Sequence, residues 1–87
     1  MDIGVEISLY PFQADFASVI HQFIDRLNGD GRFRVVSNSM STQVFGPCDA
    51  VLDVVHRELR TTFEGLEASG SGKAVFVMKV FGPLASV

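Results

Sequence analysis

The spacing of apolar residues alternates along the chain between the period of a strand and the period of a helix, and the order of these changes restricts the fold. Residues 3–9 alternate apolar with other side chains, which places one face of a strand in a core. Residues 16–27 carry apolar side chains at i, i+3, i+4, i+7, i+8 and i+11, which form one stripe of an amphipathic helix. The predicted strands are 3–10, 33–37, 42–45 and 74–81, and the predicted helices are 16–28 and 49–65.

Prolines supply the expected ends of the strands. Pro11 is predicted to end the first strand, because a proline cannot donate to the hydrogen-bond ladder. Gly46-Pro47 is predicted to break the third strand in the same way, and Gly82-Pro83 to stop the last one.

Short polar residues and glycines supply the expected ends of the helices. Asp15 is the predicted N-cap of the first helix, and Asn28-Gly29 is its predicted stop, since glycine accepts the left-handed conformation that closes a helix. The second helix is predicted to open at Asp49 and to end near Gly65. Its apolar residues are Val51, Leu52, Val55, Leu59 and Phe63.

The order of elements predicts an α+β fold, namely a ferredoxin-like βαββαβ sandwich in which a four-stranded antiparallel sheet carries two helices on one face. Right-handed crossovers then put the first and third strands side by side at the centre. A length of 87 residues gives a single domain, 1–87.

The second face of such a sheet has no helix to cover it. The last strand is apolar on both faces and should place Val75, Val77 and Phe81 on the open one, where the third strand can add Phe45. An open apolar face on a small domain favours association. We therefore expect a homo-oligomer formed through the open sheet face.

Charge and chain chemistry exclude several classes of partner. Seven Lys and Arg stand against ten Asp and Glu, a formal charge of −3, so the chain lacks the cations with which nucleic-acid binders displace phosphate counterions. No nucleic acid and no membrane are expected as partners, since no apolar run approaches the ~20 residues of a span. The acidic N-terminus argues against a signal peptide, and Cys48 has no cysteine to pair with, so we expect a cytoplasmic protein.

Two polar segments are candidate sites for a small molecule. Glu6, Ser8 and Tyr10 share the face of the first strand opposite the helices, where they can orient a polar heterocycle or simply form a half-solvated strand. The corner at residues 38–42 holds amide and hydroxyl groups, which suit either a site or an ordinary hairpin turn. The sequence does not show whether the two segments are adjacent.

No catalytic or metal centre is expected. His21 and His56 flank the apolar faces of their helices, and neither has a further ligand at metal-binding spacing. Cys48 lies at a helix start without an identifiable partner histidine. We therefore expect no catalytic residues, no metal and no cofactor.

Two short motifs resemble a known family. ISLYP at residues 7–11, followed by an amphipathic helix, is similar to the opening of the YkoF-like thiamine/hydroxymethylpyrimidine-binding family. MST at residues 40–42, with Gly46 shortly after it, resembles the second motif of that family, and Asp49-Ala50-Val51 continues the match in register. The resemblance covers the chain from Val5 to Gly82.

The resemblance implies a single-domain member that binds thiamine or its hydroxymethylpyrimidine precursor without chemistry, as a homo-oligomer. Two alternatives remain open: a small α+β-barrel-type enzyme that acts on an aromatic substrate, and a purely structural oligomerisation module. Carried over to this chain, the ligand-binding residues are Ser8, Tyr10, Asn38, Met40, Ser41 and Thr42.

Overall fold

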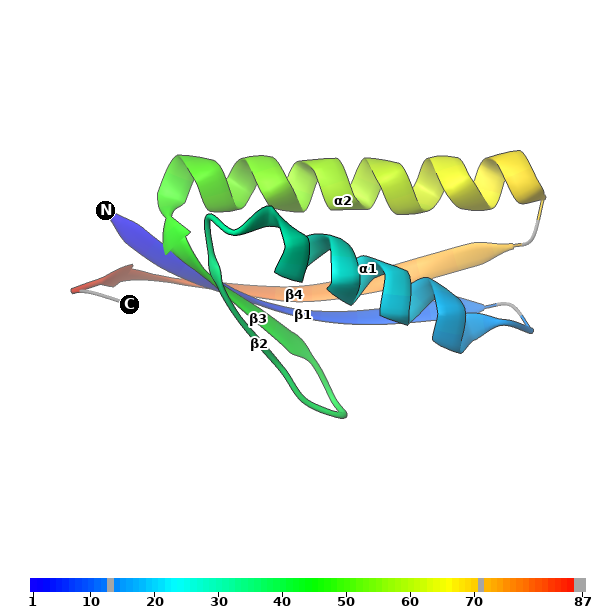
Figure 1. The fold of residues 1–87 in the computed structure, drawn as a ribbon, viewed down its shortest axis with the longest axis horizontal. Helices are drawn as coiled ribbons and strands as arrows, with labels where there is room; N and C mark the ends of the chain where they lie inside the picture. The colour runs from blue at the N-terminus through cyan, green and yellow to red at the C-terminus, as the bar shows by residue number, and fades with distance from the viewer. Residues whose placement is uncertain (13, 71, 86–87) are drawn as a thin grey trace.

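The computed structural model describes residues 1–12, 14–70 and 72–85. Its elements are β1 (Asp2–Phe12), α1 (Phe16–Asp30), β2 (Arg34–Ser37), β3 (Thr42–Pro47), α2 (Cys48–Ser69) and β4 (Lys73–Leu84). The strands form one antiparallel sheet in the order β2-β3-β1-β4, and both helices lie on the same face of it (Figure 1). The predicted ferredoxin-like fold is confirmed, with β1 and β3 at the centre.

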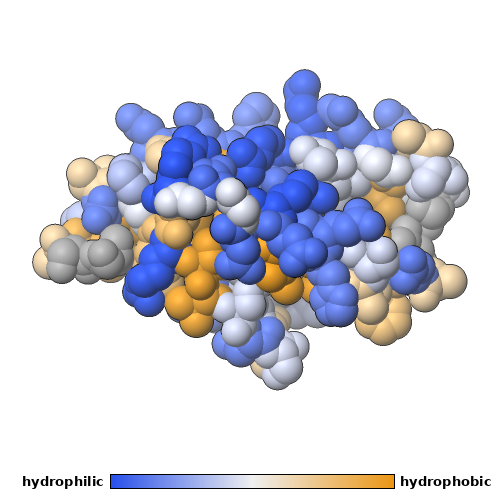
Figure 2. Space-filling view, in the orientation of Figure 1, coloured by the Kyte–Doolittle hydropathy of each residue, from blue (hydrophilic) through white to orange (hydrophobic). Residues whose placement is uncertain are grey.

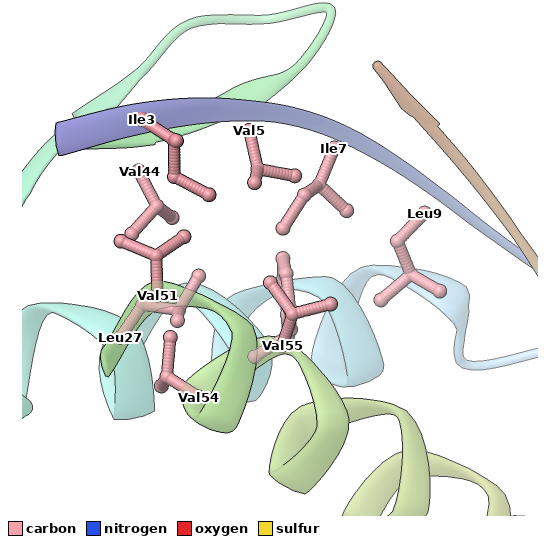
Figure 3. Packing of buried hydrophobic residues seen from close by; sticks show 10 residues of the cluster. Ile3, Val5, Ile7, Leu9, Leu27, Val44, Val51, Val54 and Val55 are labelled. Atoms are coloured by element: carbon pink, nitrogen blue, oxygen red, sulfur yellow. The ribbon is translucent and has the colours of Figure 1, made fainter. Parts of the chain in front are cut away.

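The core lies between the sheet and the helices. The alternating apolar residues of β1 point into it, and valines and a leucine from β3, α1 and α2 meet them from the other sides (Figure 3). This packing buries the side chains that the two periodicities single out. The residues labelled there are Ile3, Val5, Ile7, Leu9, Leu27, Val44, Val51, Val54 and Val55.

Both helices run past their predicted ends. The first one stops at Gly31, two residues beyond Gly29, and the second one stops at Gly70, where φ is 64°. Gly65 does not end α2 because Leu66, which is 6% exposed, extends the buried stripe by a further turn. A glycine inside a helix costs only about 1 kcal/mol, which this burial offsets. At the other end, α2 begins at Cys48, one residue before the predicted Asp49.

The buried face of α2 is also rotated from the prediction. Leu52 and Phe63 are each 46% exposed, while Glu58 and Thr62 are buried at 2% and 6%. Arg26 of α1 makes this possible, since its Nε donates to Glu58 Oε1 at 2.7 Å. A buried carboxylate needs such a partner because its desolvation is costly.

The ion pairs extend to the end of α1 through Arg57, whose Nη2 also lies 3.4 Å from Glu58 Oε2. Arg32 Nε donates to Asp30 Oδ1 at 2.6 Å, and Arg57 Nη1 of α2 donates to Asp30 Oδ2 at 3.1 Å. The hydrogen bond from Arg32, helped by the one from Arg57, lowers the pKa of Asp30 from 3.8 to about 2. The same contact raises the pKa of Arg32.

The prolines do not end the strands as predicted. Pro11 lies inside β1, opposite Ala74, at a point where the register of β1 with β3 has already stopped at Ile7. On that side β1 is an edge, where a proline is tolerated. Pro47 is likewise the last residue of β3 rather than beyond it, and Cys48 begins α2 directly.

The last strand continues beyond Gly82-Pro83, and a bulge lies at this point. Asp2 pairs with Leu84 while Gly4 pairs with Phe81, so β4 has one extra residue here and Gly82-Pro83 stays within the strand. A bulge breaks the ladder locally, and this lets the strand carry a proline.

The open face of the sheet has the predicted apolar residues. Register places Val75, Val77 and Phe81 opposite Tyr10, Ser8 and Gly4, which all lie on the side away from the buried residues of β1. The ring of Phe45 packs against Phe81 with centroids 6.0 Å apart, and Arg34 lies 4.2 Å over Phe45.

Hydrophilic side chains cover the outer surface of the helices, and hydrophobic ones show between the helices and the hairpin (Figure 2). None of the helices in the described part of the chain is long and apolar enough to cross a membrane.

Candidate ligand-binding site

The free edge of β1 forms the floor of a pocket. Pairing with β3 ends at Ile7, opposite Thr42, whereas pairing with β4 continues to Phe12. Along residues 8–12, β1 therefore has β4 as its only partner among the described strands. The turn between β2 and β3 and the first half of α1 enclose this edge in a pocket of about 320 Å³. That volume is at the lower end of the range for small-molecule sites.

The turn at residues 38–41 is built around Asn38. Its Oδ1 accepts hydrogen bonds from the backbone N–H groups of Met40 at 2.8 Å and Ser41 at 3.0 Å. Its own backbone N–H donates to the carbonyl of Ser41 at 3.0 Å. An asparagine side chain commonly orders a turn in this way, so Asn38 holds the polar wall of the pocket in shape.

Two serines fasten this turn to β1. Ser8 Oγ donates to the carbonyl of Met40 at 3.2 Å, across 32 residues of sequence. Ser41 Oγ donates to Glu6 Oε2 at 3.3 Å, and Gln43 Nε2 donates to the same oxygen at 3.2 Å. The end of the first strand and the corner are therefore adjacent, which the sequence alone leaves undecided.

Ser41 and Thr42 lie on different faces of the sheet. Ser41 shares the open face with Glu6, whereas Thr42 pairs with Ile7 and is 4% exposed on the helix side. The Thr42 hydroxyl lies 3.2 Å from that of Ser37, with which it shares a hydrogen bond. Both residues nevertheless line the pocket, since it wraps around the end of β3.

Three aromatic residues stand at the pocket with large exposed areas. Tyr10, Phe12 and Phe16 are 50%, 63% and 55% exposed, and Met40 is 78% exposed. Exposed aromatic faces of this kind can stack on a planar heterocycle. The apolar lining beneath them consists of Ile7, Leu9, Ile20, Phe23 and Ile24.

The pocket gathers all the residues predicted as ligand contacts except Ser8. Ser8 is absent from the described lining and reaches the site through its bond to Met40. Phe12, Phe16 and Ser39 line the pocket but were not predicted. The clustering of Tyr10, Phe12 and Phe16 within seven positions was an available signal, but a helical stripe and a strand end account for the phenylalanines equally well.

A larger groove of about 650 Å³ lies between the two helices. Its one cation, among the described lining residues, is Arg26, which already donates to Glu58 and, at 3.5 Å, to Thr62. The groove therefore offers less unused polar chemistry than its size suggests. His21 and His56 are exposed on their helices, and residues 1–12, 14–70 and 72–85 contain no group of three metal-ligating side chains.

The fold and the pocket together define a small ferredoxin-like domain with a neutral, aromatic-rimmed cavity beside its first strand. No protein-family model matches the sequence, and no curated protein does. Solved structures match it along almost the whole chain.

One such structure is a Thermotoga maritima protein whose name proposes a role in thiamine biosynthesis or salvage, with a TM-score of 0.79 and 17% identity over 100% of this chain and 89% of that one. A domain of unknown function, DUF77, from Bacillus cereus has a TM-score of 0.75 and 20% identity over 99% of this chain and 80% of that one. A hypothetical protein of Methanocaldococcus jannascii has a TM-score of 0.75 and 18% identity over 99% and 84%. At these identities the likeness shows a shared fold.

Proposed function

We propose that this protein binds the aminopyrimidine of thiamine, or of its hydroxymethylpyrimidine precursor, in the pocket beside β1, without chemistry and as a homo-oligomer. The observation that carries the proposal is the joining of the two polar segments, residues 8–12 and 38–42, around one cavity with aromatic residues at its mouth.

The chemistry of the pocket suits such a ring. An aminopyrimidine has one exocyclic donor group and ring-nitrogen acceptors, and Ser39, Ser41 and Thr42 supply hydroxyl groups at the wall. The unpaired side of β1 adds the backbone N–H and C=O groups of alternate residues between 8 and 12, although Pro11 has no N–H. Tyr10 and Phe16 offer faces for stacking on the ring, or on the cationic thiazolium of thiamine.

Two likenesses support the choice of ligand. The ISLYP and MST motifs resemble the YkoF-like family, and both motifs contribute residues to the pocket. A neighbour in fold also carries a name that refers to thiamine biosynthesis or salvage. We place the role in the cytoplasm, where a lone thiol such as Cys48 stays reduced.

A thermal-shift measurement with hydroxymethylpyrimidine and thiamine tests the proposal. A ligand present at 100 times its dissociation constant stabilises the folded state by about 2.7 kcal/mol, so the unfolding temperature should rise clearly. Tyr10→Ala should weaken binding by about 5- to 150-fold through loss of a stacking face worth ~1–3 kcal/mol.

Leu52→Ala is the matched control, since Leu52 is a similarly exposed apolar residue on α2, away from the pocket. It should bind like the parent. If the parent shows no shift with either compound, or if both variants bind equally well, the proposed site is wrong.

A further inference from the structure

We propose that the pocket selects the unphosphorylated aminopyrimidine alcohol against its phosphate esters. This inference rests on the proposed function and names the chemical form of the ligand. It follows from the charges in and around the cavity.

The pocket wall is neutral. Of the described residues that line it, none is a lysine, arginine, histidine, aspartate or glutamate. Phosphate oxygens are acceptors only, and proteins hold them with arginine or lysine side chains or with several N–H groups. A phosphate carried into this cavity would lose hydration without gaining a cation.

Three donors of the turn are already engaged. The hydroxyl of Ser41 donates to Glu6, and the N–H groups of Met40 and Ser41 donate to Asn38. These bonds hold the donors of the turn away from an anion in the cavity. The neutral polar and aromatic side chains of the wall suit an uncharged ring that has both donors and acceptors.

The ionised group that is hydrogen-bonded to the pocket wall is a carboxylate. Glu6 accepts from the wall residue Ser41 at 3.3 Å, and the exposed Lys79 lies 3.9 Å from its other carboxylate oxygen on the β4 side.

The lysine that pairs with a pocket residue of β1 lies on the β4 side of that strand, away from the pocket. Lys73 is the partner of Phe12 on β4, whereas the turn and the pocket lie toward β3. It therefore does not complete an anion site within the cavity.

Calorimetric titration of hydroxymethylpyrimidine and of its phosphate ester into the parent protein tests the inference. The alcohol should bind at least about tenfold more tightly, because the ester places unpaired acceptors in the wall region. Equal or tighter binding of the ester would overturn the inference. If neither compound binds, the proposed function fails as well.

A charge variant tests whether this wall sets the preference. Ser39 is exposed and lines the pocket, so Ser39→Lys should favour the ester relative to the alcohol by about 2- to 5-fold, the range of an exposed charge pair. Thr61→Lys adds the same charge at an exposed position of the groove between the helices and should leave the ratio as in the parent. A ratio that both variants change equally, or that neither changes, would contradict the assignment to this wall.

Discussion

Gly4 gives the open sheet face its shape, because the aromatic rings of two strands meet above it. A Cβ atom at this position would lie 2.5 Å from ring carbons of Phe81 and 3.0 Å from the ring of Phe45. Those two rings pack edge to face, with an interplanar angle of 74°. The missing side chain is therefore a packing requirement at the centre of the exposed face.

Gly4→Ala should lower the free energy of unfolding by about 1–3 kcal/mol, the usual range for overpacking. Gly29→Ala is the control: it lies in α1 with nothing within 4 Å of its Cβ position, and alanine there should stabilise the helix by about 0.5–1 kcal/mol. Urea denaturation measures both. If Gly4→Ala is as stable as the parent, the ring of Phe81 moves freely and is not packed as described.

The hydroxyl groups around the turn give a second prediction at this scale. Each of Ser8→Ala, Tyr10→Phe, Ser41→Ala and Thr42→Val removes one hydroxyl from the pocket lining or from the attachment of the turn to β1. Loss of a hydroxyl that pairs with a buried ligand group, or that orients such a hydroxyl, should weaken binding by ~1–3 kcal/mol, or about 5- to 150-fold. Calorimetric titration of hydroxymethylpyrimidine gives the result.

Thr61→Val serves as the control for these variants, because Thr61 is an exposed hydroxyl residue of the groove between the helices. If all four variants bind as the control does, the hydroxyls of both motifs are irrelevant to recognition.

At the scale of elements, strand alternation could be predicted from the sequence, and strand ends could not. The period of two identifies Ile3, Val5 and Ile7 as core residues, because the face on which a side chain lies follows from alternation within its own strand. Whether Pro11 interrupts the strand depends on whether a neighbouring strand needs an N–H donor at that position, and this depends on how far β3 extends.

The candidate site could also be predicted only in part from the sequence. The residue types of the two polar segments are visible in the sequence, whereas their adjacency depends on β1 outlasting β3 and on the bond from Ser8 to Met40. The buried Glu58 could not be predicted either, since its partner Arg26 is 32 residues away on another helix.

The junction of α1 with α2 makes stability depend on pH in acid. The pKa of Asp30 is about 2 in the folded protein against 3.8 ordinarily, so its contribution is complete above pH 3.8 and is lost as the pH falls toward 2. Both arginine partners are about half exposed, which keeps the contribution below about 1 kcal/mol.

Asp30→Asn should therefore reduce the stability at neutral pH slightly and flatten its dependence on pH between 3.8 and 2. Urea denaturation at a series of pH values measures this, with Asp25→Asn at an exposed position of the same helix as the control. A parent-like slope in Asp30→Asn would show that this carboxylate does not couple the helices.

For the whole molecule, the sheet is the surface on which we expect a second copy. Val77 is 51% exposed and lies on the open face opposite Ser8, with Val75 and Phe81 at 43% and 39% exposure along the same strand. These three residues make an apolar surface that the helices do not cover, whereas Phe45 on the same face is only 8% exposed. Such a surface on a small domain is usually a contact surface.

Val77→Asp should dissociate the oligomer and leave the monomer folded, because the new charge is solvated in the monomer and buried in the assembly. Sedimentation velocity with circular dichroism measures both effects. Leu52→Asp, at a comparably exposed apolar position on α2, should keep the assembly. A parent that sediments as a monomer at high micromolar concentration would contradict the proposed association.

The most direct test of the binding site is a map of backbone amide shifts during titration with hydroxymethylpyrimidine. The largest changes should fall on the amides of residues that line the pocket, namely Leu9, Tyr10, Phe12, Phe16, Ile20, Phe23, Ile24 and residues 38–42. The residues of the groove between the helices, 61–69, and those of the open face, 75–81, should change little. Changes centred on either of those surfaces, or none at saturating ligand, would contradict the account.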